Sequence, residues 1–194
     1  MQRGNPSVEQ MTYEPILHVV LYQPEIPDNA GSVGRTCVAA GAKLWMVRPL
    51  GFHLTDRHLR RAALDYWQHL NWQVVADWNE LVQHLPPDRM WFFSKWGELC
   101  YTEVAYSPGD VLVFGSESQG LPQWIRRTYA SRLLRIPIRQ QARSLNLAVS
   151  VAIGVFEALR QFGPLAPIVR VLEKPAEESL ELGKPPQSSH SGKS

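Results

Sequence analysis

Short apolar runs alternate along this sequence with segments of helical pattern. Short runs rich in β-branched and aromatic residues predict buried strands, and they lie at Ile16–Tyr22, Leu44–Val47, Gln73–Ala76, Met90–Ser94, Val111–Phe114 and Leu133–Ile136. The segments between and after them predict helices at Asn29–Ala40, Thr55–Leu64, Asp77–Leu85, Pro122–Tyr129 and Ser144–Phe162. Strands that alternate with helices are typical of an α/β domain with a mostly parallel sheet flanked by helices.

Local residues define several helix ends. Gly41 suits a left-handed position after the first helix, and Asp77 with Glu80 forms a start resembling a capping box. Ser144 can cap the last helix, which is apolar on most faces and is therefore expected to be buried. Asn146 would then lie in the first turn of an apolar helix, where we expect it to have a buried hydrogen-bond partner.

The ends of the chain differ in composition from its middle. The sequence has 194 residues, a length that suits one domain with a tail. Residues 1–15 are polar and lack any period, and residues 164–194 are rich in proline and serine. Such segments bury too little apolar surface to order themselves. We therefore predict a flexible N-terminus at 1–15, one domain at 16–163 and a disordered tail at 164–194.

Cysteine and histidine usage argues against several classes of protein. Cys37 and Cys100 have no CxxC spacing, and the histidines have no metal-ligand spacing, so a disulfide scaffold and a metal site are not expected. The polar N-terminus does not resemble a signal peptide, and the longest apolar stretch is too short and too interrupted to span a membrane. We predict a cytoplasmic protein with no metal and no membrane partner.

Ligands of parallel α/β sheets bind at the carboxyl ends of the strands. Three loops are expected there: Gln23–Gly34, Gly115–Pro122 and Pro137–Asn146. Gly115 and Gly120 allow close backbone approach and positive φ, but their loop has neither a dinucleotide-binding nor a P-loop pattern. It is either a ligand loop or an ordinary turn between a strand and a helix. Arg35, on the glycine-bearing first helix, is either a surface charge or an anion contact.

Arginine is concentrated in one part of the chain. The segment from Ser118 to Phe156 contains no acid but holds Arg126, Arg127, Arg132, Arg135, Arg139 and Arg143, and a second cluster comprises Arg57, Arg60 and Arg61. Guanidinium groups suit planar contacts to phosphate, so these clusters indicate either RNA binding or a solvated basic face. The seven tryptophans are better explained by a core or a dimer interface than by base stacking.

Three segments resemble the SPOUT superfamily of RNA methyltransferases: YQPEIPDNAGSVGRTC, FGSESQGLP and RIPIRQQARSLNLAVSVAIGVFEALRQ. The segment LRRAALDYW lies between the first two. The resemblance covers Leu17 to Gly163 and is greatest for the small branch that methylates the ribose 2′-oxygen of the tRNA wobble nucleotide, cytidine or uridine. It implies that residues 16–163 form a methyltransferase domain with a C-terminal trefoil knot. It also implies a homodimer, a tRNA substrate and S-adenosyl-L-methionine as methyl donor.

The resemblance also implies site residues by motif match. The catalytic pair would be Arg35 and Asn29. The cofactor would be bound by Phe93, Gly115, Glu117, Gly120, Ile136, Ile138, Ser144 and Asn146, and RNA by Arg60, Arg61, Arg139 and Arg143. A guanidinium cannot readily act as a base, so we expect Arg35 to orient the 2′-hydroxyl and to stabilise its developing charge. Two alternatives stay open: methylation of another tRNA or rRNA position, and a catalytically silent RNA-binding protein of the same fold.

Overall fold

The sheet confirms the predicted α/β class. The computed structural model describes residues 15–54 and 66–163, and within them seven strands form one parallel sheet in the order β3-β2-β1-β6-β4-β7-β5. The strands are β1 (His18–Tyr22), β2 (Lys43–Val47), β3 (Trp72–Val75), β4 (Met90–Phe93), β5 (Leu99–Cys100), β6 (Val111–Phe114) and β7 (Leu133–Arg135). The strand β5 was not predicted from the sequence. The trefoil knot stays a prediction.

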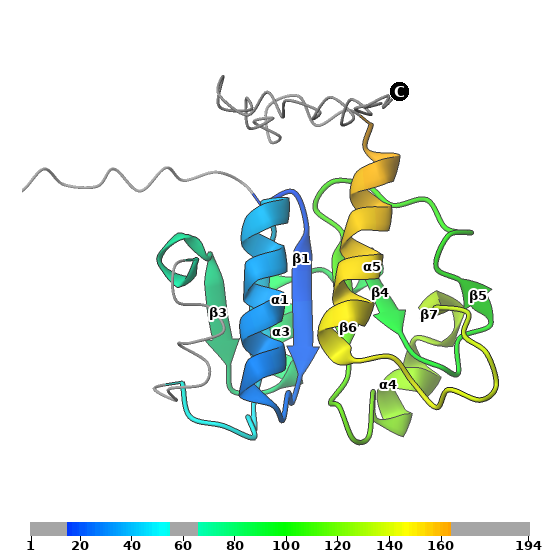
Figure 1. Cartoon of the computed structure of the whole chain (residues 1–194), viewed down its shortest axis with the longest axis horizontal. Helices are drawn as coiled ribbons and strands as arrows, with labels where there is room; N and C mark the ends of the chain where they lie inside the picture. The colour runs from blue at the N-terminus through cyan, green and yellow to red at the C-terminus, as the bar shows by residue number, and fades with distance from the viewer. Residues whose placement is uncertain (1–14, 55–65, 164–194) are drawn as a thin grey trace, which may run out of the picture.

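Helices cover both faces of the sheet. They are α1 (Pro27–Ala40), α3 (Trp78–His84), α4 (Gln123–Thr128) and α5 (Leu147–Gln161), with short 3-10 turns at Trp67–His69, Pro87–Arg89 and Ala130–Arg132. Figure 1 shows α1 and α5 side by side over one face. The predicted helix Thr55–Leu64 lies outside the described residues, as do the N-terminus up to residue 14 and the tail from residue 164.

Two apolar clusters fill the layers on either side of the sheet. Val19 and Leu21 of β1 belong to the cluster that includes buried residues of α1 and α5. Val20, between them, belongs to the cluster that includes Trp78 of α3 and Ile125 of α4. Strands buried on both faces read as continuous apolar runs, which is why these strands were visible in the sequence.

Several helix ends follow the predicted chemistry. Gly41 has φ 68° after α1, and the side chain of Asp77 accepts a hydrogen bond from the Glu80 amide at the start of α3.

The prediction for α5 was wrong in two respects. It begins at Leu147, with Asn146 rather than Ser144 as its cap, and it is not buried on most faces, since Val149 is 48% and Phe156 53% exposed.

No helix within residues 15–54 and 66–163 is long and apolar enough to cross a membrane. No cluster of three or more histidine, cysteine or acidic side chains there could hold a metal ion. Cys37 and Cys100 are both free thiols, and Cys37 is buried.

Candidate active site

The carboxyl ends of the central strands surround a cavity of about 370 Å³. All strands run the same way, so these ends meet at one edge of the sheet, the lower edge in Figure 1. Three segments line the cavity: residues 93–96, which begin at the last residue of β4, residues 114–121, which begin at the last residue of β6, and parts of the segment from Ile136 to Ser150 after β7. Segments far apart in the sequence thus converge where a parallel sheet binds its ligands.

Most of the predicted cofactor residues lie together in this cavity. Its lining includes Phe93, Gly115, Glu117, Gly120, Ile136, Ile138 and Ser144. Asn146 is absent from the lining, although its neighbours Leu145 and Leu147 contribute. Ser94, Lys95 and Trp96 also line the cavity. They were not predicted, because the segment after β4 has no glycine-rich or basic pattern to single it out.

The loop after β6 folds back on itself, and its two glycines make this possible. The Gly120 amide donates to the Ser116 carbonyl at 2.8 Å, and Gly120 has φ +67°. A Cβ at Gly115 would collide with the backbone of Gly120 and Leu121. An ordinary turn would not need this tight closure, so Gly115 is fixed by close backbone approach and Gly120 by its left-handed conformation.

Glu117 ties this loop to the start of α1. Its carboxylate accepts hydrogen bonds from the amides of Glu25 at 2.8 Å and Ile26 at 3.2 Å, and from the Asn29 side chain at 2.9 Å. The tie is reciprocal, because the Glu25 carboxylate accepts from the amide and hydroxyl of Ser118 at 3.1 and 2.6 Å. A carboxylate at this position also stabilises a helix N-terminus that has no side-chain cap of its own.

Asn29 extends the same network to the third loop. Its side-chain oxygen accepts from the Asn146 amide group at 2.9 Å, and the Asn146 oxygen accepts from the amides of Ala148 and Val149. Asn29 is only 8% exposed, so the predicted buried partner of Asn146 is confirmed. In this arrangement Asn29 holds two loops in place and contributes no lining to the cavity.

The base of the cavity is aromatic. The rings of Phe93 and Phe114 stack with centroids 4.5 Å apart, and both line the cavity. Gly154 lets α5 pack directly on them, because a Cβ there would stand 2.7 Å from the Phe93 ring. The cavity therefore joins an apolar base to loops rich in backbone polar groups, a combination that suits a nucleoside ligand.

Arg35 lies apart from this cavity within one chain. It is exposed on α1, with its guanidinium carbon 4.9 Å from the centroid of the Tyr66 ring. None of the described residues of α1 lines the cavity. The predicted catalytic arginine and the predicted cofactor residues are therefore not brought together by a single copy of the chain.

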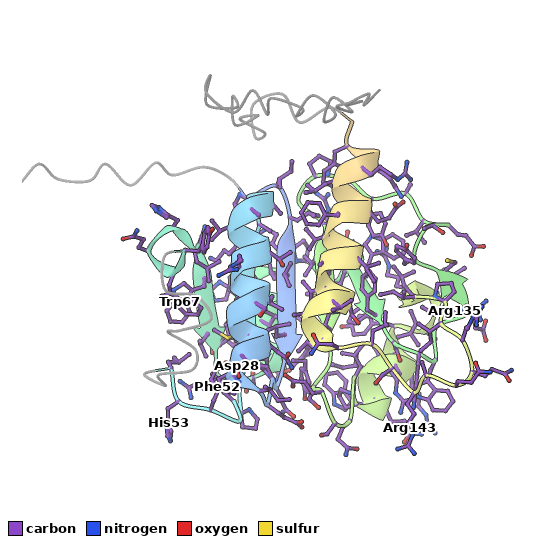
Figure 2. The ribbon with its side chains drawn as sticks, in the orientation of Figure 1. Asp28, Phe52, His53, Trp67, Arg135 and Arg143 are labelled. Carbon is purple, nitrogen blue, oxygen red and sulfur yellow. The ribbon has the colours of Figure 1, made fainter. Side chains whose placement is uncertain are left out.

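The predicted RNA-binding arginines have different outcomes. Arg143 lines the cavity and Arg139 is exposed on the same loop, while Arg60 and Arg61 lie outside the described residues. Figure 2 shows Arg143 near the lower edge of the molecule and Arg135 near β5, on the same side. The basic segment thus borders the cavity, as expected of a site that receives a polyanion.

A family comparison agrees with this geometry. The model of the SpoU rRNA Methylase family matches residues 16–156 of the chain. The chain belongs to the SpoU rRNA methylase family. This membership confirms, at the level of the family, the resemblance to RNA methyltransferases seen in the sequence, and the matched range includes every segment that lines the cavity.

Known proteins similar to this SpoU methylase were found by sequence and by structure. One relative, the "tRNA (cytidine(34)-2'-O)-methyltransferase" of Burkholderia pseudomallei (strain 1106a), is 44% identical over 151 residues, which cover 76% of this chain and 97% of the relative. A solved structure described as "Structural insights into the 2-OH methylation of C/U34 on tRNA" is 45% identical, has a TM-score of 0.72, and is matched over 75% of this chain and 95% of its own.

A more distant structure contains the methyl donor. The "AdoMet bound rRNA methyltransferase from Sinorhizobium meliloti" is 28% identical to this SpoU methylase, with a TM-score of 0.68. The match covers 76% of this chain but 57% of that one.

Proposed function

We propose that this SpoU methylase transfers a methyl group from S-adenosyl-L-methionine to the ribose 2′-oxygen of nucleotide 34 of tRNA, a cytidine or a uridine. The observation that carries the proposal is that two of the predicted loops, Gly115–Pro122 and Pro137–Asn146, line one cavity together with the segment that follows β4. Relatives named for this reaction match over nearly their whole length, which supports the choice of substrate.

The cavity suits the proposed cofactor. When bound, S-adenosyl-L-methionine supplies a methyl group activated by a sulfonium, so the protein has to position the acceptor and stabilise its charge. The backbone of the Gly115–Gly120 loop and of the Ile136–Asn146 segment would hold the polar ends of the cofactor. Phe93 would support its apolar surface. Gly115 leaves no room for any side chain, which fits a loop whose backbone contacts the ligand.

Arg35 would reach the reacting groups from a second copy of the chain. Within one chain it lies outside the cavity, while α5, the neighbour of α1, exposes Val149 and Phe156. Exposed large apolar side chains on one side of a helix are typical of an interface between subunits. A homodimer formed through α1 and α5 would cover them and could bring Arg35 to the partner's cavity.

The side chains proposed for catalysis and binding have roles that suit their chemical groups. Arg35 donates hydrogen bonds to the 2′-oxygen as negative charge develops there. Asn29 acts through Glu117 and Asn146, as a positioning residue. Arg139 and Arg143, with Arg60 and Arg61, neutralise phosphates of the tRNA. An enzyme of this substrate class is expected to work in the cytoplasm.

The decisive experiment is a map of 2′-O-methylation in tRNA and rRNA from cells with and without the protein, together with methylation of anticodon stem-loops by the purified enzyme. We expect one methyl group to be lost at nucleotide 34 of a subset of tRNAs. Loss at another tRNA position or in rRNA would contradict the proposed substrate. An unchanged map, with no cofactor binding by calorimetry, would indicate a silent RNA-binding protein.

A further inference from the structure

The most exposed large apolar side chain in the described residues is Trp96, at 62%. It follows β4 in a turn that the fold holds tightly. The Ser94 amide donates to the Leu134 carbonyl at 2.8 Å, the Gly97 amide donates to the Ser94 carbonyl at 3.1 Å, and a Cβ at Gly97 would collide with the backbone of β7. An indole presented to solvent by so constrained a turn costs little ordering entropy when a partner binds it.

Trp96 stands between the cofactor cavity and a second one. The second cavity has a volume of about 410 Å³ and is lined by Trp96, Glu98, Gln123, Arg126, Arg127, Ala130, Ser131 and Leu133. Trp96 is the residue that both cavities share. A ligand in the second cavity would therefore lie directly beside whatever reacts in the first.

Two cations lie over the indole. The Lys95 ammonium is 5.2 Å from the Trp96 ring centroid, and the Arg126 guanidinium carbon is 5.7 Å from it. Arg126 is held by a 3.1 Å hydrogen bond from its Nε to the Leu121 carbonyl, and Arg127 beside it is exposed. Glu98 is the one acid in the lining of the second cavity. A flat aromatic face with several guanidinium and ammonium groups complements a base and its phosphate.

We propose that this second cavity is a subsite for an unpaired nucleotide that neighbours the methylated one. Its base stacks on the indole of Trp96, and its phosphate is held by Arg126 and Arg127. The proposal rests on the proposed function, because it assumes that an RNA enters the adjoining cavity. For Trp96 it departs from the expectation that a core or a dimer interface explains the tryptophans of this chain better than base stacking.

The test measures binding of a labelled anticodon stem-loop RNA to the full chain by fluorescence anisotropy, without cofactor, for wild type, W96F and W96L. Leucine is apolar but smaller and has no aromatic face, so W96L should weaken RNA binding by about tenfold, the scale of one lost base stack. W96F should recover most of that loss. The matched control is W124L, since Trp124 is 45% exposed on α4 and lines neither cavity.

A second variant tests the phosphate contact. R127Q should lower the salt dependence of RNA binding by about one counterion. In steady-state methylation at saturating S-adenosyl-L-methionine, W96L should raise KM for the RNA by a larger factor than it lowers kcat, because stacking holds the substrate and transition state alike. The proposal is overturned if W96L binds RNA as tightly as W124L, if W96F is as weak as W96L, or if W96L changes the oligomeric state measured by sedimentation.

The outcomes separate this subsite from the proposed reaction. If wild type binds the stem-loop through Trp96 but methylates no nucleotide 34, the reaction fails while the subsite stands. If nucleotide 34 is methylated with the same KM by wild type and W96L, the subsite fails while the reaction stands.

Discussion

The side-chain amide of Asn29 donates a 2.9 Å hydrogen bond to the carboxylate of Glu117, 88 residues further along the chain. The same amide group accepts from Asn146, 117 residues away. One buried side chain thus fixes the relative positions of the three loops that the sequence placed at the carboxyl edge of the sheet. The shape of the cavity follows from this network as much as from the sheet itself.

Replacing Asn29 by aspartate should break the network. The substitution removes the donor to Glu117 and sets a second carboxylate against it, in a buried position where like charges cannot both ionise cheaply. We expect a loss of about 2 kcal/mol in the free energy of unfolding and a weaker affinity for S-adenosyl-L-methionine. Urea unfolding and calorimetric titration measure the two effects.

The control for that variant is Asn79→Asp, the same chemical change at an exposed position of α3. Its stability should stay within about 0.5 kcal/mol of wild type, as for most surface substitutions. Equal stability of the Asn29→Asp and Asn79→Asp variants would show that the hydrogen bond between Asn29 and Glu117 is dispensable.

Gly115→Ala should reduce cofactor binding by more than tenfold, or about 1.4 kcal/mol. The added methyl group collides with the backbone of Gly120 and Leu121, so the loop has to open and its backbone groups move. Gly120→Ala is the matched comparison, because a Cβ there meets nothing within 4 Å and the cost comes from φ +67° alone. A folded Gly115→Ala variant with normal affinity would remove this loop from the cofactor site.

The fold class and the left-handed conformations of Gly41 and Gly120 could be predicted, because they depend on residues close together in the sequence. Apolar runs of four or five residues between helical segments fit buried parallel strands and little else. Gly41 and Gly120 have the positive φ that their turns need. Both inferences use residues that are neighbours in the sequence.

The parts that could not be predicted depend on contacts between distant residues. Strand β5 has two residues, Leu99 and Cys100, and exists through its pairing with β7. Ser144 and Asn146 are both good N-caps. The residue that caps α5 is Asn146, which also donates a hydrogen bond to Asn29. No local sequence pattern reveals that bond. The separation of Arg35 from the cavity is likewise a property of the packed helices.

The stability of the protein should fall between pH 6.5 and 4 because of His18. Burial, with the charges of Lys43 and Arg89, lowers the pKa of His18 from 6.5 to about 4. Between pH 6.5 and 4 the unfolded chain therefore binds a proton at His18 that the folded chain does not bind. The contribution of neutral His18 to the free energy of unfolding is complete above pH 6.5 and is lost as pH falls toward 4. Urea unfolding at pH 7, 5.5 and 4.5 should show a shallower decline for His18→Gln. An identical decline in the free energy of unfolding for wild type and His18→Gln would show that groups other than His18 cause the acid sensitivity.

Phe156→Glu should convert the proposed dimer to a monomer. Phe156 is 53% exposed on α5, and a carboxylate buried without a partner at an interface is strongly unfavourable. Sedimentation velocity measures the change, and Gln83→Glu on the exposed side of α3 is the control. The methylation rate should fall together with the dimer. A monomeric variant that keeps full activity would contradict a site shared between subunits.

Arg35→Ala should cut the single-turnover methylation rate by roughly 10²–10³, the scale for removing one donor to a developing oxyanion. Affinity for S-adenosyl-L-methionine should hardly change, since Arg35 is proposed to contact the 2′-oxygen, and the cofactor is proposed to be held by the loops that line the cavity. Arg35→Lys should restore part of the rate, because an ammonium supplies charge without the planar pair of donors. Saturating tRNA in the assay separates loss of chemistry from loss of RNA binding.

Mixed dimers decide from which subunit Arg35 acts. A dimer that combines one Arg35→Ala copy with one Gly115→Ala copy holds a single intact site only if arginine and cofactor loop come from different chains. Co-expressed mixtures should then recover activity well above that of either variant alone, toward half of the wild-type rate in purified mixed dimers. If the two residues act in the same chain, every site in the mixed dimer carries one defect and no recovery follows. A normal single-turnover rate for Arg35→Ala itself would leave this arginine as a surface charge that packs on Tyr66.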